Sequence, residues 1–303
     1  MSQDFDQRII HIISDGLGKQ VIKAQAFTTG LSHYVFDVET DDHLSYVVRL
    51  APPERRLELK QGLYWQAKLE QIGVPLPKIY RTGELDGHAF VIYERLPGDD
   101  LEHLYPTLSS TVRQRLACTV AEIQQKIGTL DDPSFHSARP WMAILHTILE
   151  RSEREIASSG LCDGRYVGIA RTRMAQHGDY WAAVRPVAFL YDLNVRNVIV
   201  DHEQVSGIID VDEMWFGDSL LAIGRGKTLL QLMQQDTDYI TAWCEYLKLS
   251  ERQLRVVDFY ALLYCVRFMG TVGQRLNGNP NVTTDPGNIP LLEHLAQNLC
   301  ANP

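Results

Sequence analysis

The 303-residue sequence lacks the features of several large protein classes. Its five cysteines are widely spaced and form no Cys-x-x-Cys pair, so neither a disulfide framework nor a cysteine-based zinc site is indicated. This cysteine usage favours a reducing, cytoplasmic compartment. Lys and Arg total 29 against 38 Asp and Glu, and the net charge is −9. Such an acidic balance gives no basic footprint for general nucleic-acid binding, and we expect no nucleic-acid partner.

Long apolar runs are also missing. The longest stretches, such as residues 260–266, are far too short to cross a bilayer. The N-terminal segment carries two acids before any apolar run, unlike an export signal. We therefore expect no membrane partner, while the sequence leaves the oligomeric state open.

The amino-acid composition is that of a folded protein. Hydrophobic residues make up 45% and charged residues 22%, close to the globular average. The length is enough for about two domains or one bilobed domain.

The hydrophobic pattern changes character near residue 96. Before this point, β-branched and aromatic runs at 21–27, 34–39 and 44–50 predict an antiparallel meander. Pro52 and Pro53 signal the start of a helix that Gly73 and Pro75 end. Two further strands, 78–82 and 88–94, flank an Asp-Gly turn.

The second part is mostly helical. Amphipathic stretches are found at 111–127, 141–156 and 167–175, with several more from 220 to 299. Short apolar runs at 187–190, 198–201 and 205–209 predict small strands with loops between them. This α+β pattern is the outline of a bilobal, protein-kinase-like fold. We expect a nucleotide-binding lobe at 1–95, with an antiparallel sheet and a helix, and a helical catalytic and substrate-binding lobe at 96–303.

The segment from residue 190 to 210 carries the chemistry. Asn197 stands five residues after Asp192, and Asp210 follows thirteen residues later, with apolar strands between them. Phosphoryl transfer needs a carboxylate to orient the attacking hydroxyl and hard oxygen ligands for magnesium. The predicted hairpin would bring Asn197 and Asp210 to the same end. Individually these residues could be ordinary turn and cap residues, but their joint spacing favours the catalytic interpretation.

Compared with the kinase pattern H-R-D-L-x-x-x-N, the segment keeps Asp192, Leu193 and Asn197 but has Leu190 and Tyr191 in place of His and Arg. Further segments fit at 27–36 (FTTGLSHYVF), 46–50 (YVVRL), 74–78 (VPLPK), 90–98 (FVIYERLPG) and 217–219 (GDS). Together these resemble the aminoglycoside phosphotransferase and choline kinase family of small-molecule kinases, from about residue 20 to about residue 235.

The resemblance implies roles for individual residues. Asp192 would be the catalytic carboxylate, and Asn197 and Asp210 the Mg²⁺ ligands. Arg49 would contact the α- and β-phosphates of ATP or GTP, because a guanidinium can bind phosphate bidentately. Glu58 would be the helix-borne partner of Arg49. Thr29, Gly30 and Ser32 would cover the phosphates. The backbone of Glu94 and Leu96 would contact the base.

Two departures bear on activity. Leu190 replaces a family His that would brace the catalytic loop, and Ala222 stands where the family commonly has an Asp. One alternative is therefore a pseudokinase that binds nucleotide without turnover, and another is an interaction domain without nucleotide. The persistence of Asp192, Asn197 and Asp210 favours an active enzyme.

Two other segments have the residues of a known motif but not its required spacing. His177-Gly178-Asp179 is the family tripeptide, but no Asn follows at the required distance, so we expect a loop or part of the acceptor side. Gly226-Lys227-Thr228 lacks the earlier glycine of a P-loop and is expected to be helical.

The acceptor is the least determined part. Trp215 and Phe216, near Asp212, Glu213 and Asp218, could form a pocket for a cationic acceptor, although core aromatics and capping acids are slightly favoured. An aminoglycoside-like amino sugar is the first candidate acceptor. Choline, a homoserine-like amino alcohol or a metabolic sugar are the alternatives.

Overall fold

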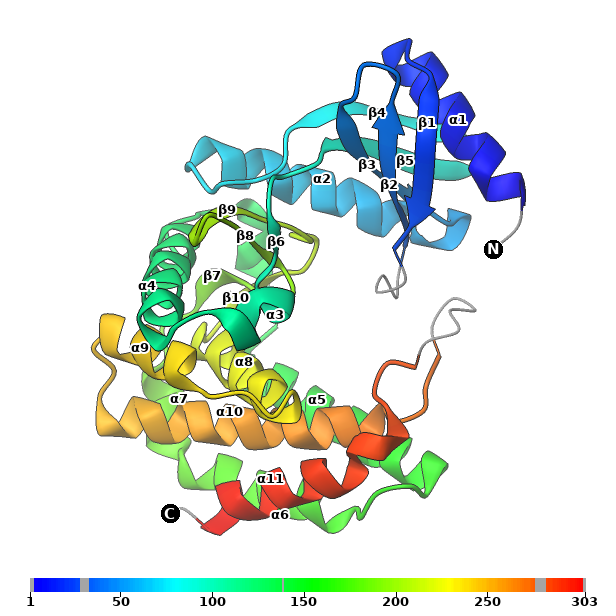
Figure 1. The fold of residues 1–303 in the computed structure, drawn as a ribbon. Helices are drawn as coiled ribbons and strands as arrows, with labels where there is room; N and C mark the ends of the chain where they lie inside the picture. Colours follow the sequence, from blue (N-terminus) through cyan, green and yellow to red (C-terminus); the bar gives the residue numbers. More distant parts are fainter. Residues whose placement is uncertain (1–2, 28–32, 138, 276–281, 302–303) are drawn as a thin grey trace. The chain divides into compact units, whose positions relative to one another are not determined.

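A computed structural model of the chain describes residues 3–27, 33–137, 139–275 and 282–301 (Figure 1). It contains two compact units. The first unit is formed mainly by Met1–Gly98 and Ser206–Asp212, and the second mainly by Asp99–Val205, Glu213–Gln274 and Val282–Pro303.

The first unit is an antiparallel sheet with a helix on each face. The sheet has the order β1-β2-β3-β5-β4. Its elements are α1 (Gln3–Leu17), β1 (Val21–Ala26), β2 (Tyr34–Thr40), β3 (Ser45–Ala51), the 3-10 turn Pro53–Arg55, α2 (Arg56–Gln71), β4 (Ile79–Leu85) and β5 (His88–Glu94). The predicted meander, helix and final hairpin are confirmed, whereas α1 was not predicted.

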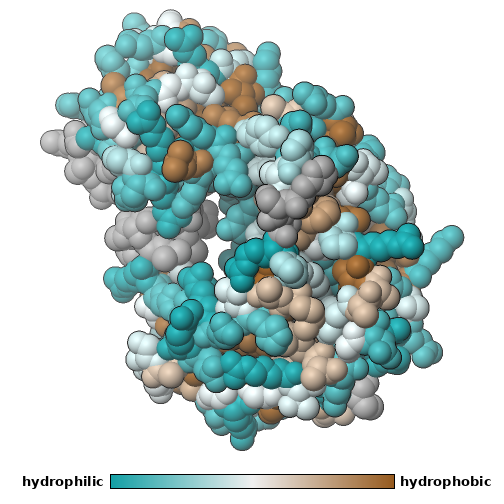
Figure 2. Space-filling model, turned by 180° about the vertical axis from the view of Figure 1, so that it is seen from behind, coloured by the Kyte–Doolittle hydropathy of each residue, from teal (hydrophilic) through white to brown (hydrophobic). Residues whose placement is uncertain are grey.

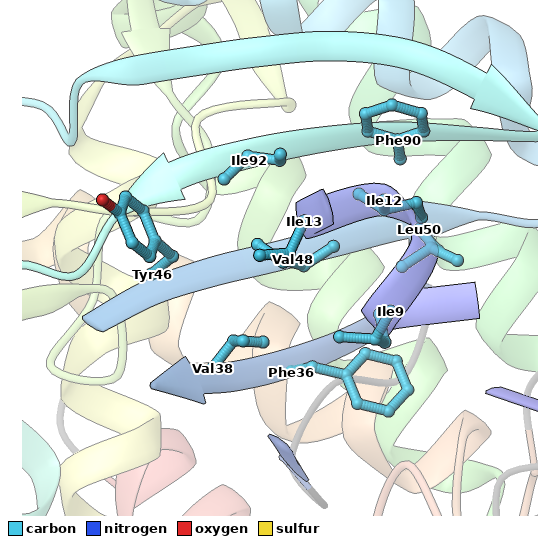
Figure 3. Close-up of a cluster of buried hydrophobic side chains, with 10 residues drawn as sticks. All are labelled: Ile9, Ile12, Ile13, Phe36, Val38, Tyr46, Val48, Leu50, Phe90 and Ile92. Atoms are coloured by element: carbon cyan, nitrogen blue, oxygen red, sulfur yellow. The ribbon is translucent and has the colours of Figure 1, made fainter. Parts of the chain in front are cut away.

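One face of the sheet packs against α1. Helical spacing places Ile9, Ile12 and Ile13 on the same side of the helix, where all three are buried. Figure 3 shows them beside sheet side chains, namely Phe36 and Val38 from β2, Tyr46, Val48 and Leu50 from β3, and Phe90 and Ile92 from β5. This packing makes β3 and β5 the rigid centre of the first unit.

The other face packs against α2. Successive side chains of a strand point to opposite faces, so Ala89 and Val91 of β5 turn away from α1. They form a second cluster with Ala51 and with Leu59 of α2. A strand buried on both faces has few alternative registers, and this fixes the position of Arg49 on the neighbouring β3.

The segment Ser206–Asp212 belongs to the first unit, although the sequence predicts it within the lobe 96–303. The reason is a backbone contact: the N–H of Ile208 donates to the carbonyl of Pro75 at 2.8 Å. Gly207 permits this approach, because a Cβ there would lie 2.6 Å from Leu96 Cδ1 and 3.3 Å from the Pro75 carbonyl oxygen.

The second unit is mainly helical and carries two small sheets. β7 pairs with β10, and β6, β8 and β9 form a sheet in the order β6-β8-β9. Its helices and strands are β6 (Asp99–Asp100), α3 (Leu101–Leu104), α4 (Ser110–Ile127), α5 (Trp141–Ser159), α6 (Arg165–Gln176), α7 (Gly178–Ala183), β7 (Val187–Leu190), β8 (Val198–Asp201), β10 (Met214–Gly217), α8 (Leu220–Leu232), α9 (Asp238–Tyr246), α10 (Glu251–Gly270) and α11 (Ile289–Ala301). Strand β9 (Gln204–Ile208) begins in this unit, and its residues 206–208 belong to the first unit. The predicted strands 187–190 and 198–201 are confirmed, and Gly226-Lys227-Thr228 lies in α8 as expected.

Helix α10 is the centre of this unit. It is buried along most of its length and packs against α5, α8 and α11 (Figure 1). Gly224 lets α8 approach closely, because a Cβ there would lie 2.4 Å from Tyr260 Cβ. The Thr228 hydroxyl then donates to the Ala261 carbonyl at 2.9 Å. This close contact positions α8, and with it Arg225.

The surface shows no extended apolar face from the side seen in Figure 2, where hydrophobic residues are scattered among hydrophilic ones. Within the described residues, no helix combines the length and apolar character that crossing a membrane requires.

Candidate active site

In the first unit, Arg49 is the centre of a charged cluster. Its side chain is only 12% exposed, and one guanidinium nitrogen contacts three partners. It donates to Nδ1 of His33 at 2.6 Å, to Oδ1 of Asp210 at 3.2 Å and to Oδ2 of Asp212. The cluster therefore joins β3 to the loop that follows β9.

Burial and charge compete in this cluster. Burial lowers the pKa of Arg49, but the carboxylates of Asp210 and Asp212 outweigh it, so the net shift is upward and the guanidinium stays charged. Burial also raises the pKa of Asp212 to about 6, although Arg49 opposes the shift. Gly62 of α2 makes room for this acid, because a Cβ there would lie 2.0 Å from Asp212 Oδ1.

His33 is neutral in this cluster. A guanidinium can only donate, so Nδ1 of His33 is the acceptor and the ring proton is on Nε2. Burial, and then the nearby charge of Arg49, lower the pKa of His33 to about 3.

Asp210 is the most accessible acid of the cluster. Its side chain is 49% exposed, and only Oδ1 contacts Arg49. Its backbone has φ of 56°, in the left-handed region that non-glycine residues rarely adopt. Asp210 is thus held by its backbone and by Arg49 while much of its carboxylate remains exposed.

The expected pairing of Arg49 with Glu58 is wrong in this structure. Glu58 instead pairs with Arg55 at 2.7 Å, and its side chain is 52% exposed. Glu58 lies at the start of α2, and the acids that neutralise Arg49 come from the far more distant loop after β9. Thr29, Gly30 and Ser32 lie outside the described residues.

Of Glu94 and Leu96, the two residues expected at the nucleotide base, one keeps a free backbone donor. The N–H of Glu94 donates to the Lys78 carbonyl at 2.8 Å and is therefore engaged. Across the described chain, the N–H of Leu96 has no hydrogen-bond partner, while its side chain is buried.

In the second unit, Asp192 lies in the loop between β7 and β8. Its Oδ1 contacts both the side-chain amide of Asn194 and the guanidinium of Arg225. Its Oδ2 has no hydrogen-bond partner among the described residues. The side chain is 27% exposed, so one carboxylate oxygen is fixed and the other is accessible.

Asn197 is anchored in the same loop. Its Nδ2 donates to the Asp192 carbonyl at 2.8 Å, which leaves Oδ1 without a donor from the described part of the protein. Asn197 Oδ1 and the exposed carboxylate of Asp210 are hard oxygen donors, the type that Mg²⁺ prefers. The chemistry of both residues therefore fits a magnesium ligand.

Arg225 was missed from the sequence. Its side chain is 15% exposed, and its guanidinium carbon lies 5.0 Å from the ring centroid of Tyr191 and 5.8 Å from that of Tyr264. Tyr191 in turn stacks on Trp215 at 4.1 Å. In the sequence Arg225 stands between two glycines and two residues before Lys227 in a predicted helix, and this pattern gives no signal of a partner for Asp192.

The aromatic and acidic residues considered for an acceptor pocket have internal partners. Trp215 stacks on Tyr191, and Phe216 stacks on Phe135 at 4.8 Å. Asp218 is buried and accepts hydrogen bonds from Tyr180, Tyr260 and the Leu220 N–H. Trp215 and Phe216 are half-buried and stacked on neighbouring rings, and Asp218 is a buried, hydrogen-bonded acid.

The low pKa of His33 predicts a pH dependence of stability. Its folded-state pKa lies below its unfolded value near 6.5, so its contribution is fully present above pH 6.5 and is lost as the pH falls toward 3. We expect the free energy of unfolding to fall by up to about 1.4 kcal/mol per pH unit from this group between pH 6 and 4. Urea unfolding at each pH measures it.

The matched variants are His33→Asn and His202→Asn, since the His202 side chain is 95% exposed. We expect a shallower pH dependence only in His33→Asn. Equal slopes in both variants would contradict the assignment.

Comparison with known proteins gives the fold and family. No curated protein matches the sequence. Among solved structures, the chain is similar to a mutant of aminoglycoside 2'-phosphotransferase IIIa in complex with GDP (17% identity, TM-score 0.71, covering 98% of this chain and 97% of that one). It is also similar to the streptomycin–ATP complex of aminoglycoside phosphotransferase (2'')-IIa (13%, 0.68, 98% and 96%).

A third similar structure is a putative fructosamine-3-kinase from Haemophilus somnus (14% identity, TM-score 0.60, covering 96% of each chain). These likenesses show a protein-kinase-like fold. The model of the phosphotransferase enzyme family matches residues 23–221, well over half of the chain. The chain therefore belongs to the phosphotransferase enzyme family and is a small-molecule phosphotransferase.

Proposed function

We propose that this phosphotransferase transfers the γ-phosphoryl group of ATP or GTP to a hydroxyl of a small molecule, with Asp192 as the catalytic carboxylate. The observation that carries the proposal is the asymmetry of Asp192. Asn194 and Arg225 hold Oδ1, and Oδ2 is left to accept a hydrogen bond from the acceptor hydroxyl. A carboxylate fixed in this way is oriented before the substrate arrives.

The nucleotide contacts follow from the Arg49 cluster and the connector. Arg49 is a charged donor that would bind the α- and β-phosphates. Asn197 and Asp210 would hold Mg²⁺, which neutralises charge on the phosphates when bound. The free N–H of Leu96 would donate to the base. Similar structures contain ATP or GDP, which supports a nucleoside triphosphate donor and leaves the base open.

In the proposed reaction, the acceptor oxygen forms a bond to the γ-phosphorus while the bond from that phosphorus to the β–γ bridging oxygen breaks. The hydroxyl proton moves to Asp192 Oδ2 and is then released to solvent. The nucleoside diphosphate leaves with the electron pair of the broken bond. Asp192 orients the hydroxyl and receives the proton, and Arg49 contributes positive charge at the phosphates.

For the acceptor, an aminoglycoside-like amino sugar is the first candidate. Its support comes from the similar aminoglycoside phosphotransferases, because Asp212 and Asp218 are engaged inside the protein and give no separate argument for a cationic acceptor. The similar fructosamine kinase structure favours a glycated amine as a second candidate.

The decisive experiment measures nucleoside diphosphate release from Mg-ATP and Mg-GTP. The acceptor panel contains aminoglycosides, fructosamines, amino alcohols and simple sugars. We expect one class to stimulate release, and Asp192→Asn to lower kcat by about 10²–10⁴-fold.

The matched control is Asp201→Asn, at the end of β8, where Asp201 lies 3.9 Å from His202. It should keep wild-type kcat. Equal kcat in wild type and Asp192→Asn would contradict the role of Asp192. Nucleotide binding without release for any acceptor would favour a pseudokinase.

Arg225 should act on kcat through Asp192. Arg225→Gln removes the charge that holds Oδ1, and we expect kcat to fall on the order of tenfold with KM for the nucleotide unchanged. Arg225→Lys should restore part of the loss. Arg151→Gln, at an exposed arginine of α5, is the control. A rise in nucleotide KM at constant kcat would contradict the positioning role.

A further inference from the structure

A cavity of about 360 Å³ lies in the second unit, bounded by residues of α6, α7, α10 and α11. It contains His177, from the tripeptide that the sequence singled out and the proposed reaction leaves unused. The His177 ring lies 5.9 Å from the rings of Trp181 and Phe259, centroid to centroid. The cavity therefore has an aromatic wall, and it includes none of the residues proposed to act in catalysis.

Three arginines line the cavity: Arg173 of α6, and Arg252 and Arg255 of α10. Arg252 and Arg255 are three residues apart and so lie on one side of the helix, where like charges repel. Such a concentration of positive charge is notable in a chain whose net charge is −9.

Arg173 donates to the Cys300 carbonyl, whereas nearby acids neutralise Arg252 and Arg255 only in part. Within the described residues, Arg252 has no carboxylate within 4.0 Å and lies over the Tyr180 ring at 5.8 Å. Arg255 reaches Glu251 only at 4.0 Å, and the Glu251 side chain is 92% exposed. Of the two acids that line the cavity, Asp258 is paired with Lys227, and Asp179 is exposed.

The positive charge around the cavity also affects the pKa of His177. Burial lowers its pKa, and the charges of Arg255, Arg173 and Arg252 lower it further. A neutral imidazole among cations can donate one N–H to an anion without adding charge.

We propose that this cavity binds a phosphate dianion, free or carried as a monoester on a small molecule. Guanidinium groups bind phosphate oxygens bidentately, and Arg252 and Arg255 of α10 line this cavity together with Arg173 of α6. The volume lies at the small end of ligand pockets, which fits a phosphate or a small phosphate ester. The proposal is independent of the phosphotransferase reaction.

Isothermal titration of the full chain with inorganic phosphate and with glycerol phosphate, at constant ionic strength, tests this site. We expect saturable binding that Arg252→Gln/Arg255→Gln weakens by about tenfold or more. Tighter binding of glycerol phosphate would identify a phosphate monoester as the ligand, and equal or tighter binding of inorganic phosphate would identify the free anion.

Two controls locate the site. Arg151→Gln/Arg154→Gln removes the same charge at the same spacing from the exposed side of α5. Arg49→Gln changes the proposed nucleotide site. Both should bind phosphate like wild type.

The proposal would be overturned by no saturable binding to wild type, by equal loss in both double variants, or by loss in Arg49→Gln alone. Because the exposed arginines could still affect folding, the single variant Arg252→Lys is included. It keeps the charge and should retain part of the affinity, and wild-type affinity in both this variant and the double variant would also count against the site.

Discussion

The buried charge of Arg49 is the constraint on which the first unit depends. A guanidinium that is 12% exposed on a central strand needs anions close by, because an unpaired buried charge is costly. The anions come from Asp210 and Asp212, more than 160 residues further along the chain. This requirement, with the Ile208–Pro75 backbone bond, explains why Ser206–Asp212 packs with the first unit. The same ion pairs hold Asp210, the proposed magnesium ligand.

In the second unit the group that is held is an anion, the carboxylate of Asp192. Asp192 is held at one oxygen by Arg225 and Asn194, and Arg225 is held by two tyrosine rings. Leu190, which replaces the family histidine, is a core residue of β7 and makes no polar contact with the loop through its side chain. Arg225 and Asn194 thus hold the Asp192 carboxylate although position 190 has no histidine.

The sequence was most informative where chemistry requires fixed spacing or where strands alternate. The sequence was sufficient to predict the strands β2, β3 and β5 and the short strands β7 and β8. It also showed the spacing of Asp192, Asn197 and Asp210. Helix α1 was missed although its isoleucines have helical spacing, because its first residues are polar. The four-residue strand β10 carries too few residues to show a period.

The errors in the site concern partners brought together by tertiary structure. Glu58 was chosen for Arg49 because it lies on the next helix, but the structure places Asp210 and Asp212 there. Arg225, likewise, is 33 residues from Asp192, and nothing in local pattern links the two. The three arginines that line the cavity of the second unit come from α6 and α10, which are far apart in the sequence. The net negative charge of the chain gives no sign that they lie near one another.

The role of the Arg49 cluster is tested most directly by the affinity for ADP, measured by titration calorimetry with and without Mg²⁺. We expect wild type to bind Mg-ADP more tightly than ADP alone. We also expect Arg49→Gln to weaken binding by at least about tenfold, whereas Arg252→Gln/Arg255→Gln should not. Equal affinity of wild type and Arg49→Gln would contradict the assignment of the Arg49 cluster to the nucleotide phosphates.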